Sequence, residues 1–355
     1  MGWTEDPNMR WRRPGVGWLA ERMIHAGRTT VGWICAAFGL PDVPGAAIIP
    51  VSRGAMGRIW RLDLGADRFA VKELFWDADE ESARNEAELT AQLEAAGIRL
   101  PASVPGADGS FVARLPADAG GGWLRLYRWI DGVPADLGDA GVAAPVGRLL
   151  GRLHACALPP RGEADPWYDT VPDPVTWDQL ADSALAHRAP WAASLAGRSG
   201  MLREPSTLVT PQAGDPLITC HRDLHPDNVL VDGSGELVLL DWDDAGPASP
   251  GRELARLLAE WHVHDGKPDA AAVRHTVAAY QAAGGPGRIR DEQSFGMLIA
   301  CTLNFLHAQA GVALDPSAAP GHRQHALAEI SDSLARLPTP GLIAQLINLA
   351  APLTS

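Results

Sequence analysis

The sequence contains almost no lysine. Only Lys72 and Lys267 are lysines among the 30 basic residues, and 43 acidic residues give a formal net charge of −13. Neutralising the phosphates of a nucleic acid requires clustered Lys and Arg, which this chain lacks. We therefore expect no nucleic-acid partner. A cationic small molecule would suit the negative charge, although excess acid also serves solubility.

Cysteines and long apolar runs are also scarce. Four cysteines lie far apart without a CxxC pair, which argues against a disulfide framework and is typical of reduced thiols in the cytoplasm. The apolar run at 31–40 has about half of the roughly 20 residues that a membrane helix needs. The first residues have no apolar signal-peptide core. We expect a cytoplasmic protein without a membrane partner.

The pattern of apolar residues changes along the chain. Residues 15–40 have a mostly helical distribution, and residues 46–75 contain three short β runs separated by small turns, which predict an antiparallel meander. Residues 77–98 are rich in Ala, Glu and Leu and end near Gly97, which predicts a helix with a glycine cap. After Gly132 the chain is mainly helix and loop, apart from LITC and one hairpin. The fold class is therefore α+β.

These changes divide the chain into four parts. We predict an N-terminal helical extension at 1–45, a small β-rich lobe with one helix at 46–127, a hinge at 128–134, and a larger helical lobe at 135–355. A chain of 355 residues is long enough for two coupled domains.

One segment gathers an unusual number of carboxylates: HRDLHPDNVLVDGSGELVLLDWDD at 221–244. VLVD and ELVLLD around a glycine turn predict a β-hairpin. Pro226 prevents the preceding HRDLHPDN from being a helix, so His221 and His225 do not form a helical zinc pair.

Three oxygen-bearing side chains of this segment are candidate metal or catalytic groups. Asp223 and Asn228 precede the hairpin and Asp241 follows it, so hairpin closure is expected to bring them together. Mg²⁺ takes one or two carboxylates together with phosphate oxygens of a substrate. The spacing of Asp223 and Asn228 matches HRDxxxxN, in which the Asp accepts a hydroxyl proton and the Asn holds metal. The segment therefore predicts phosphoryl transfer.

LHPDNVLVD followed by LLDWDDAGPASPGRELARL resembles the aminoglycoside phosphotransferase and choline kinase-like family. The resemblance implies a bilobal protein-kinase-like fold, with an antiparallel sheet and one helix in the small N-lobe and a larger, mostly helical C-lobe. It also implies that Asp223 is the catalytic base and that Asn228 and Asp241 bind Mg²⁺. We place Asp227 and Asp243 outside the metal ligands, as solvated turn carboxylates or supporting groups.

Lys72 lies in the apolar strand RFAVKELF of a chain that otherwise uses arginine, which suggests that a compact ammonium is needed there. AVKEL resembles the strand that carries the family's nucleotide lysine, which contacts the ATP phosphates. Glu86 in the following helix is our choice for the carboxylate that orients Lys72. Glu88 is the fallback, because positions two apart face different sides of a helix.

Two backbone segments complete the predicted nucleotide site. Gly54 and Gly57 in VSRGAMGRIWRL resemble a degenerate phosphate loop, in which glycine lets backbone N–H groups approach phosphate. LYRWIDG at 126–132 occupies the place of the family's hinge, so backbone groups from Leu126 to Trp129 are expected to meet adenine.

The chain departs from the family pattern at two positions. Arg222 stands where members commonly have glycine, and Glu253 replaces an aspartate that steadies the catalytic loop. The second departure leaves open how that loop is held.

These observations predict a Mg²⁺- and ATP-dependent kinase that phosphorylates a hydroxyl of a small molecule. An antibiotic is the leading acceptor, with Glu260, His262 and Asp265 as candidate acceptor-binding residues. The alternatives are a metabolite kinase for a sugar, amino alcohol or homoserine, and a catalytically silent ATP-binding protein. The sequence does not decide between a monomer and a homodimer, and nothing in it supports the dimer.

Overall fold

The structure, a computed structural model, describes residues 24, 26–54, 57–211 and 216–351. It divides into two compact units, which we describe separately. The N-terminal unit contains the described residues up to Gly132 together with Val238–Asp243, and the C-terminal unit contains Val133–Leu237 and the described residues from Asp244 onward. The segment Val238–Asp243 thus returns to the unit built from the first third of the chain.

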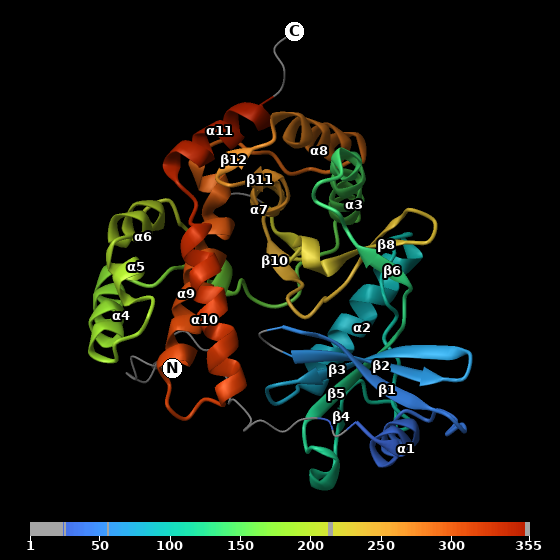
Figure 1. The fold of residues 1–355 in the computed structure, drawn as a ribbon. Helices are drawn as coiled ribbons and strands as arrows, with labels where there is room; N and C mark the ends of the chain where they lie inside the picture. Colours follow the sequence, from blue (N-terminus) through green and yellow to red (C-terminus); the bar gives the residue numbers. More distant parts are fainter. Residues whose placement is uncertain (1–23, 25, 55–56, 212–215, 352–355) are drawn as a thin grey trace. The chain divides into compact units, whose positions relative to one another are not determined.

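The N-terminal unit contains a five-stranded sheet in the order β1-β2-β3-β5-β4 (Figure 1). Its strands are β1 (Ala47–Arg53), β2 (Gly57–Leu64), β3 (Asp67–Leu74), β4 (Ala113–Arg114) and β5 (Trp123–Arg128). Neighbouring strands are antiparallel, which confirms the predicted meander. The register places Lys72 directly opposite Arg125.

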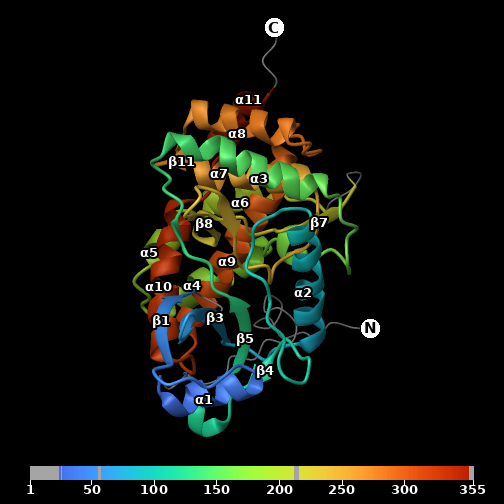
Figure 2. The same cartoon turned by 90° about the vertical axis from the view of Figure 1, so that its right-hand side faces the viewer.

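Two helices pack on opposite faces of this sheet (Figures 1 and 2). Helix α1 (Arg28–Ala37) buries Ile34 in an apolar cluster with Val71 and Leu124 from the strands. The start of the helix predicted at 15–40 lies outside the described residues. Helix α2 (Glu80–Ala95) begins after Asp79, whose carboxylate accepts the N–H of Ser82 and so caps the first turn. Side chains of a strand alternate between the two faces of a sheet. Helix α1 therefore covers the face that carries Val71, and α2 covers the face that carries Lys72.

The C-terminal unit is mostly helical. Its helices are α3 (Ala143–Ala155), α4 (Pro174–Ala186), α5 (Ala192–Ala196), α6 (Ser199–Ser206), α7 (Pro250–His262), α8 (Ala270–Ala282), α9 (Gly296–Leu314), α10 (Pro320–Ala335) and α11 (Pro340–Ala350). Its short strands are β7 (Ile218–Cys220), β8 (Val229–Asp232), β10 (Gly246–Ala248), β11 (Val263–His264) and β12 (Lys267–Pro268). Strands β6 (Gly132–Pro134) and β9 (Leu237–Leu239) lie where the chain passes from one unit to the other. Antiparallel β7 and β10 precede and follow the predicted catalytic segment.

Helix α7 is buried on almost every side. Helix α9 lies against it and is also apolar over most of its length. By length and hydropathy the stretch Glu292–Leu314 could cross a membrane, but 56% of its most apolar window is buried inside the structure. Burial of that kind is typical of a core helix.

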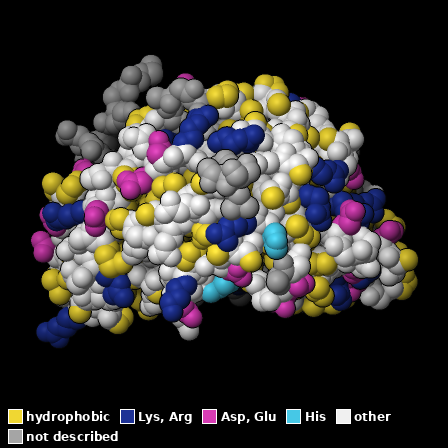
Figure 3. All heavy atoms as spheres, turned by 90° about the horizontal axis from the view of Figure 1, so that it is seen from above, with side chains coloured by type: hydrophobic (Ala, Val, Ile, Leu, Met, Phe, Trp, Pro, Cys, Tyr) yellow, Lys and Arg dark blue, Asp and Glu magenta, His cyan; other side chains and the backbone are white. Residues whose placement is uncertain are grey.

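On the face seen in Figure 3, arginine and lysine side chains are interspersed with acidic and hydrophobic ones. The positive charges on that face do not form one continuous surface.

Two glycines on α3 allow a close approach to α8. A Cβ atom at Gly147 would lie 2.3 Å from the carbonyl oxygen of Thr276, and one at Gly151 would lie 2.5 Å from that of Tyr280. Either side chain would therefore force the two helices apart.

We expect Gly147→Ala to lower the free energy of unfolding by about 1–3 kcal/mol, the usual cost of overpacking. The measurement is chemical denaturation. Gly311→Ala in α9 is the matched control, because a Cβ there meets nothing within 4 Å and alanine is the better helix former. If the two variants were equally stable, the close contact between α3 and α8 would be wrong.

Candidate active site

The predicted catalytic loop leaves β7 at Cys220 and reaches β8 through a 3₁₀ turn at Pro226–Asn228. Arg222 in this loop has a φ of 65°, a left-handed conformation that is uncommon for a residue with a side chain. The Nδ1 atom of His221 accepts the N–H of Asp223 at 3.2 Å, and the ring of His221 is fully buried. His221 therefore helps to fix the conformation of the loop through this hydrogen bond.

Asp223 and Asn228 are in direct contact. The Nδ2 atom of Asn228 donates to the backbone carbonyl of Asp223 at 2.9 Å and to its Oδ2 at 2.8 Å. Both hydrogen bonds are donated by the amide nitrogen and do not involve the amide oxygen Oδ1. An amide oxygen is a hard ligand of the kind that Mg²⁺ takes.

Arg256 on α7 holds the other oxygen of the Asp223 carboxylate. Its Nη2 donates to Asp223 Oδ1 at 2.7 Å, and its Nη1 donates to the carbonyl of Arg222. Burial alone would raise the pKa of the Asp223 carboxyl, but the Arg256 guanidinium and, to a smaller extent, His221 lower it below its usual range. Asp223 is therefore ionised and oriented at neutral pH, and is a weak base.

Glu253 on α7 also holds the catalytic loop. One carboxylate oxygen accepts the backbone N–H of Arg222, and the other lies 2.6 Å from Nε2 of His154, whose Nδ1 meets the hydroxyl of Tyr280 at 2.9 Å. Glu253, at the position where the resemblance leads to an aspartate, thus steadies the loop directly. The buried group of His154, Cys220 and Glu253 has the residue types of a metal site, but both ring nitrogens of His154 already have partners.

We expect Glu253→Gln to lower the free energy of unfolding at neutral pH by about 1.5–3 kcal/mol, the contribution of hydrogen bonds to a charged group. Burial raises the pKa of Glu253, but His154 and the Arg222 N–H lower it by more, so the net shift of this pKa is downward. In the unfolded chain the pKa of a glutamate is about 4.3, and in the folded protein the pKa of Glu253 is lower. The stabilisation is therefore present at pH values above about 4.3 and is lost as the pH falls through the folded pKa.

Wild-type protein should therefore lose more stability on acidification than Glu253→Gln does, as measured by denaturation at a series of pH values. Glu236→Gln, an exposed substitution in the hairpin turn, should follow the wild type. Parallel curves for Glu253→Gln and the wild type would contradict this role.

The N-terminal unit carries a second group of charges around Lys72. The Nζ atom of Lys72 donates to Asp241 Oδ1 and Asp243 Oδ2, both at 2.6 Å. Burial lowers the pKa of Lys72, but Asp241 and Asp243 raise it by more, so the ammonium stays charged. Asp241 has a φ of 58°, so the backbone is strained at a residue predicted to bind metal.

Asp243 is more closely involved than we predicted. Its side chain is only 17% exposed, and its second oxygen accepts Nη1 of Arg125 at 2.8 Å. Burial raises the pKa of Asp243, while Lys72 and Arg125 lower it strongly. Asp243 is a buried ion-pair partner, so of its two predicted interpretations the supporting group fits and the solvated turn carboxylate does not.

Glu86 faces the sheet as predicted, and Glu88 is exposed. The hydrogen bonds of Glu86 nevertheless go to Arg125, at 2.7 Å, and to the hydroxyl of Tyr127, at 3.1 Å, instead of to Lys72. Burial raises the pKa of Glu86 to about 7 against the opposing effect of Arg125. The prediction that Glu86 directly orients Lys72 is corrected, because a second cation lies between them.

The predicted phosphate loop is only partly described, because residues 55 and 56 lie outside the described ranges. Gly54 donates its N–H to the carbonyl of Gly57 at 3.0 Å. A Cβ at Gly57 would lie 2.6 Å from the carbonyl oxygen of Glu73. Close packing of β2 on β3 therefore explains this glycine without a ligand.

Two of the backbone groups predicted to meet adenine already have partners. The carbonyl of Leu126 accepts the N–H of Val104 at 2.8 Å, and the N–H of Trp129 donates to the backbone carbonyl of Arg68 at 3.1 Å. These two groups are therefore not free for a base in this structure, and the prediction for them is corrected.

The three acceptor-binding candidates lie in different surroundings. Glu260 accepts Nε of Arg256 at 2.7 Å, so it belongs to the support of the catalytic base. His262 is buried, and its Nε2 lies 2.7 Å from the hydroxyl of Thr276, so it is a core residue. Asp265 is an exposed turn residue with a φ of 51°. The prediction that His262 binds the acceptor is thus corrected, because packing against α8 covers this residue.

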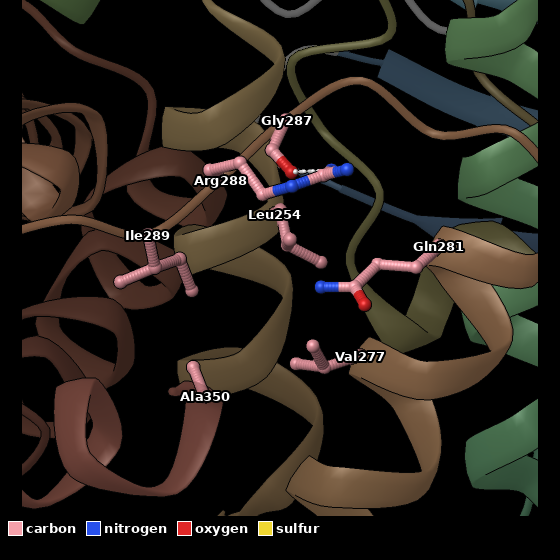
Figure 4. A pocket seen from close by; sticks show the side chains of 7 residues that line it. All are labelled: Leu254, Val277, Gln281, Gly287, Arg288, Ile289 and Ala350. Carbon is pink, nitrogen blue, oxygen red and sulfur yellow. Dashed lines mark hydrogen bonds between the residues drawn. The ribbon is translucent and has the colours of Figure 1, made fainter. Parts of the chain in front are cut away.

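A small pocket in the C-terminal unit is shown in Figure 4. Leu254, Val277, Gln281, Gly287, Arg288, Ile289 and Ala350 line it. Its volume of about 150 Å³ is below the roughly 300 Å³ at which ligand pockets begin. The Nη1 atom of Arg288 is bound to the carbonyls of Gly285 and Gly287. None of the predicted catalytic residues lines this pocket.

The structure resembles solved small-molecule kinases. A spectinomycin phosphotransferase in complex with ADP and spectinomycin has a TM-score of 0.61 at 14% identity, over 92% of this chain and 98% of that one. An amicoumacin kinase in complex with AMP-PNP, Ca²⁺ and Ami has a TM-score of 0.54 at 18% identity, over 84% of this chain and 91% of that one. A microcompartment-associated aminopropanol kinase has a TM-score of 0.55 at 14% identity, over 86% and 94%. At these identities the similarity shows the fold.

The sequence itself matches a known family. Among curated proteins, none matches it at a significant level. The phosphotransferase enzyme family, in contrast, matches residues 47–291, which is more than half of the chain and includes both charged groups described above. With its kinase-like α+β fold, the chain belongs to the phosphotransferase enzyme family, whose members are small-molecule kinases acting on hydroxyl groups.

Proposed function

We propose that this protein transfers the γ-phosphoryl group of ATP to a hydroxyl of a hydroxyl-bearing antibiotic and that it can confer resistance. The observation that carries the kinase proposal is the pairing of Asp223 with Asn228 and Arg256, because it brings an ionised carboxylate and an amide group together on one loop. The side chain of Asp223 is 34% exposed, so an acceptor hydroxyl can reach it.

Asp223 aligns the acceptor hydroxyl and accepts its proton as the bond to phosphorus forms. The transition state of phosphoryl transfer is loose, so alignment matters more than the strength of the base. A carboxylate whose pKa is held low by Arg256 is suited to this role. Lys72 binds the phosphates of the nucleotide through its buried ammonium.

Asn228 and Asp241 would hold Mg²⁺, since an amide oxygen and a carboxylate are the hard oxygen donors that it prefers. When bound, the metal neutralises charge on the transferred phosphoryl group. Asp241 now accepts a hydrogen bond from Lys72, so this lysine can exchange that carboxylate for a phosphate oxygen when nucleotide binds.

An antibiotic acceptor is supported by the resemblance to a spectinomycin phosphotransferase and an amicoumacin kinase. An amino alcohol is the second candidate, because the fold also resembles an aminopropanol kinase. Glu260 and Asp265 remain candidate acceptor contacts.

The test is an ATP-consumption screen with Mg²⁺ against aminoglycosides, other hydroxyl-bearing antibiotics, amino alcohols, sugars and homoserine, with mass spectrometry of the products. An antibiotic heavier by one phosphoryl group is the expected result. A product only from an amino alcohol, sugar or homoserine would replace the acceptor but keep the chemistry. Nucleotide binding without any product across the panel would favour a catalytically silent protein.

A further inference from the structure

A chain of ion pairs in the N-terminal unit ends at Lys72. Arg125 Nη1 bonds to Glu86 Oε2 at 2.7 Å and to Asp243 Oδ1 at 2.8 Å, and the other oxygen of Asp243 accepts Lys72 at 2.6 Å. Both oxygens of Asp243 are therefore held by protein cations. The position of Lys72 depends on Asp243, and the position of Asp243 depends on Arg125.

The backbone fixes both cations. Lys72 and Arg125 are direct partners across the antiparallel pair β3 and β5, so their side chains leave the same face of the sheet. Tyr127, two residues along β5, lies on that face too. Its hydroxyl donates to Glu86, and its ring lies 5.5 Å from the Arg125 guanidinium carbon. The guanidinium is thus enclosed by strand and helix.

The arrangement is costly as well as ordered. The Arg125 side chain is 8% exposed, and its Nη2 is buried with no hydrogen-bond partner in the described part of the chain. An unsatisfied buried donor costs about 1–3 kcal/mol, and each such group in a folded protein needs an explanation. Stability alone would favour a side chain that uses all its donors.

We propose that Arg125 is a positioning residue of the nucleotide site. It separates Glu86 from Lys72 and holds Asp243, so that Lys72 stays anchored on Asp243 while it exchanges Asp241 for a phosphate oxygen. The inference rests on the proposed nucleotide site at Lys72. It predicts that Arg125 acts on the nucleotide through Asp243.

The test is calorimetric binding of AMP-PNP with Mg²⁺ to the full chain, which needs no knowledge of the acceptor. Arg125→Met should weaken binding about tenfold or more, the effect of losing a hydrogen bond to a charged group. Arg125→Lys should bind with an affinity between those of the wild type and Arg125→Met, since lysine keeps the charge but not the fork geometry of arginine. Arg84→Met, an exposed arginine on α2 paired with Glu80, is the matched control and should bind as the wild type does.

A double-mutant cycle separates positioning from general stabilisation. If Arg125 acts through Asp243, then Arg125→Met added to Asp243→Asn should change the affinity by no more than about twofold, whereas fully additive losses would overturn the proposal. Glu86→Gln should restore thermal stability to Arg125→Met by removing the unpaired carboxylate, while nucleotide affinity stays low. This double variant also serves if Arg125→Met alone fails to fold.

Two failures can be told apart. If the wild type binds no nucleotide, the proposed function fails. If the wild type binds and Arg125→Met, or its stabilised double variant, binds within about twofold, the function stands and the role of Arg125 is wrong.

Discussion

An Asp223→Asn variant is expected to lose about 10²–10⁴ fold in turnover while it still binds nucleotide, because positioned acid–base catalysis contributes an effect of that size. Asparagine keeps the shape of the side chain but cannot accept the proton of the acceptor hydroxyl. It also leaves Arg256 without the carboxylate that it contacts at 2.7 Å. The measurement is kcat with the best acceptor from the screen, beside calorimetric binding of nucleotide.

Asp227→Asn is the matched control for this variant. Asp227 lies in the same loop, four residues away, and its side chain is 91% exposed. Its removal should leave turnover near the wild-type value. Equal losses in the two variants would show that the loop is sensitive to any charge change and would remove the special role of Asp223.

The second large effect is expected at Lys72. Lys72→Met should lower kcat/KM for ATP by about 10²–10³ fold, the cost of removing one preorganised donor from a site of developing charge. It also leaves Asp241 and Asp243 without the ammonium that both contact. Lys72→Arg should recover little of the lost kcat/KM, because a planar guanidinium does not replace a compact ammonium in a buried position.

The only other lysine is a natural control. Lys267 is exposed at the start of β12, so Lys267→Met should leave kcat/KM for ATP unchanged. Steady-state kinetics with varied ATP decide the comparison. If Lys72→Met bound and used ATP normally, the nucleotide site would have to lie elsewhere.

The features that sequence reasoning captured are local. The meander depends on short alternating runs with glycine turns between them, and the contact of Asp223 with Asn228 depends on a spacing of five residues in one loop. Lys72 was found because lysine is so rare in this chain. Each of these signals can be read within a few residues of the sequence.

The partners of these residues are distant in the sequence and could not be read in the same way. Arg125 lies in WLRLYR, where alternation predicts a side chain on the face opposite Leu124, but only α2 decides whether that face is covered. Arginine is abundant here, so neither Arg125 nor Arg256 stands out by rarity. The register of β3 and β5 together with the predicted helix face of Glu86 was the available signal for Arg125.

The error at His262 has a different cause. Helix α7 is buried around almost its whole circumference, so the polar positions near its end do not define an exposed face. His262 is polar, but the packing of α8 covers it. Burial then lowers its pKa to about 4, so it is neutral at physiological pH.

Asp223 is proposed to control transfer of the ATP γ-phosphoryl group to a small-molecule hydroxyl. The most direct measurement uses ATP labelled in its γ-phosphoryl group, with Mg²⁺ and the acceptor identified by the screen, followed by mass spectrometry. We expect the label to appear in the acceptor with the wild type and to fall by about 10² fold or more with Asp223→Asn. Label found only in inorganic phosphate, or equal labelling of the acceptor by both proteins, would contradict it.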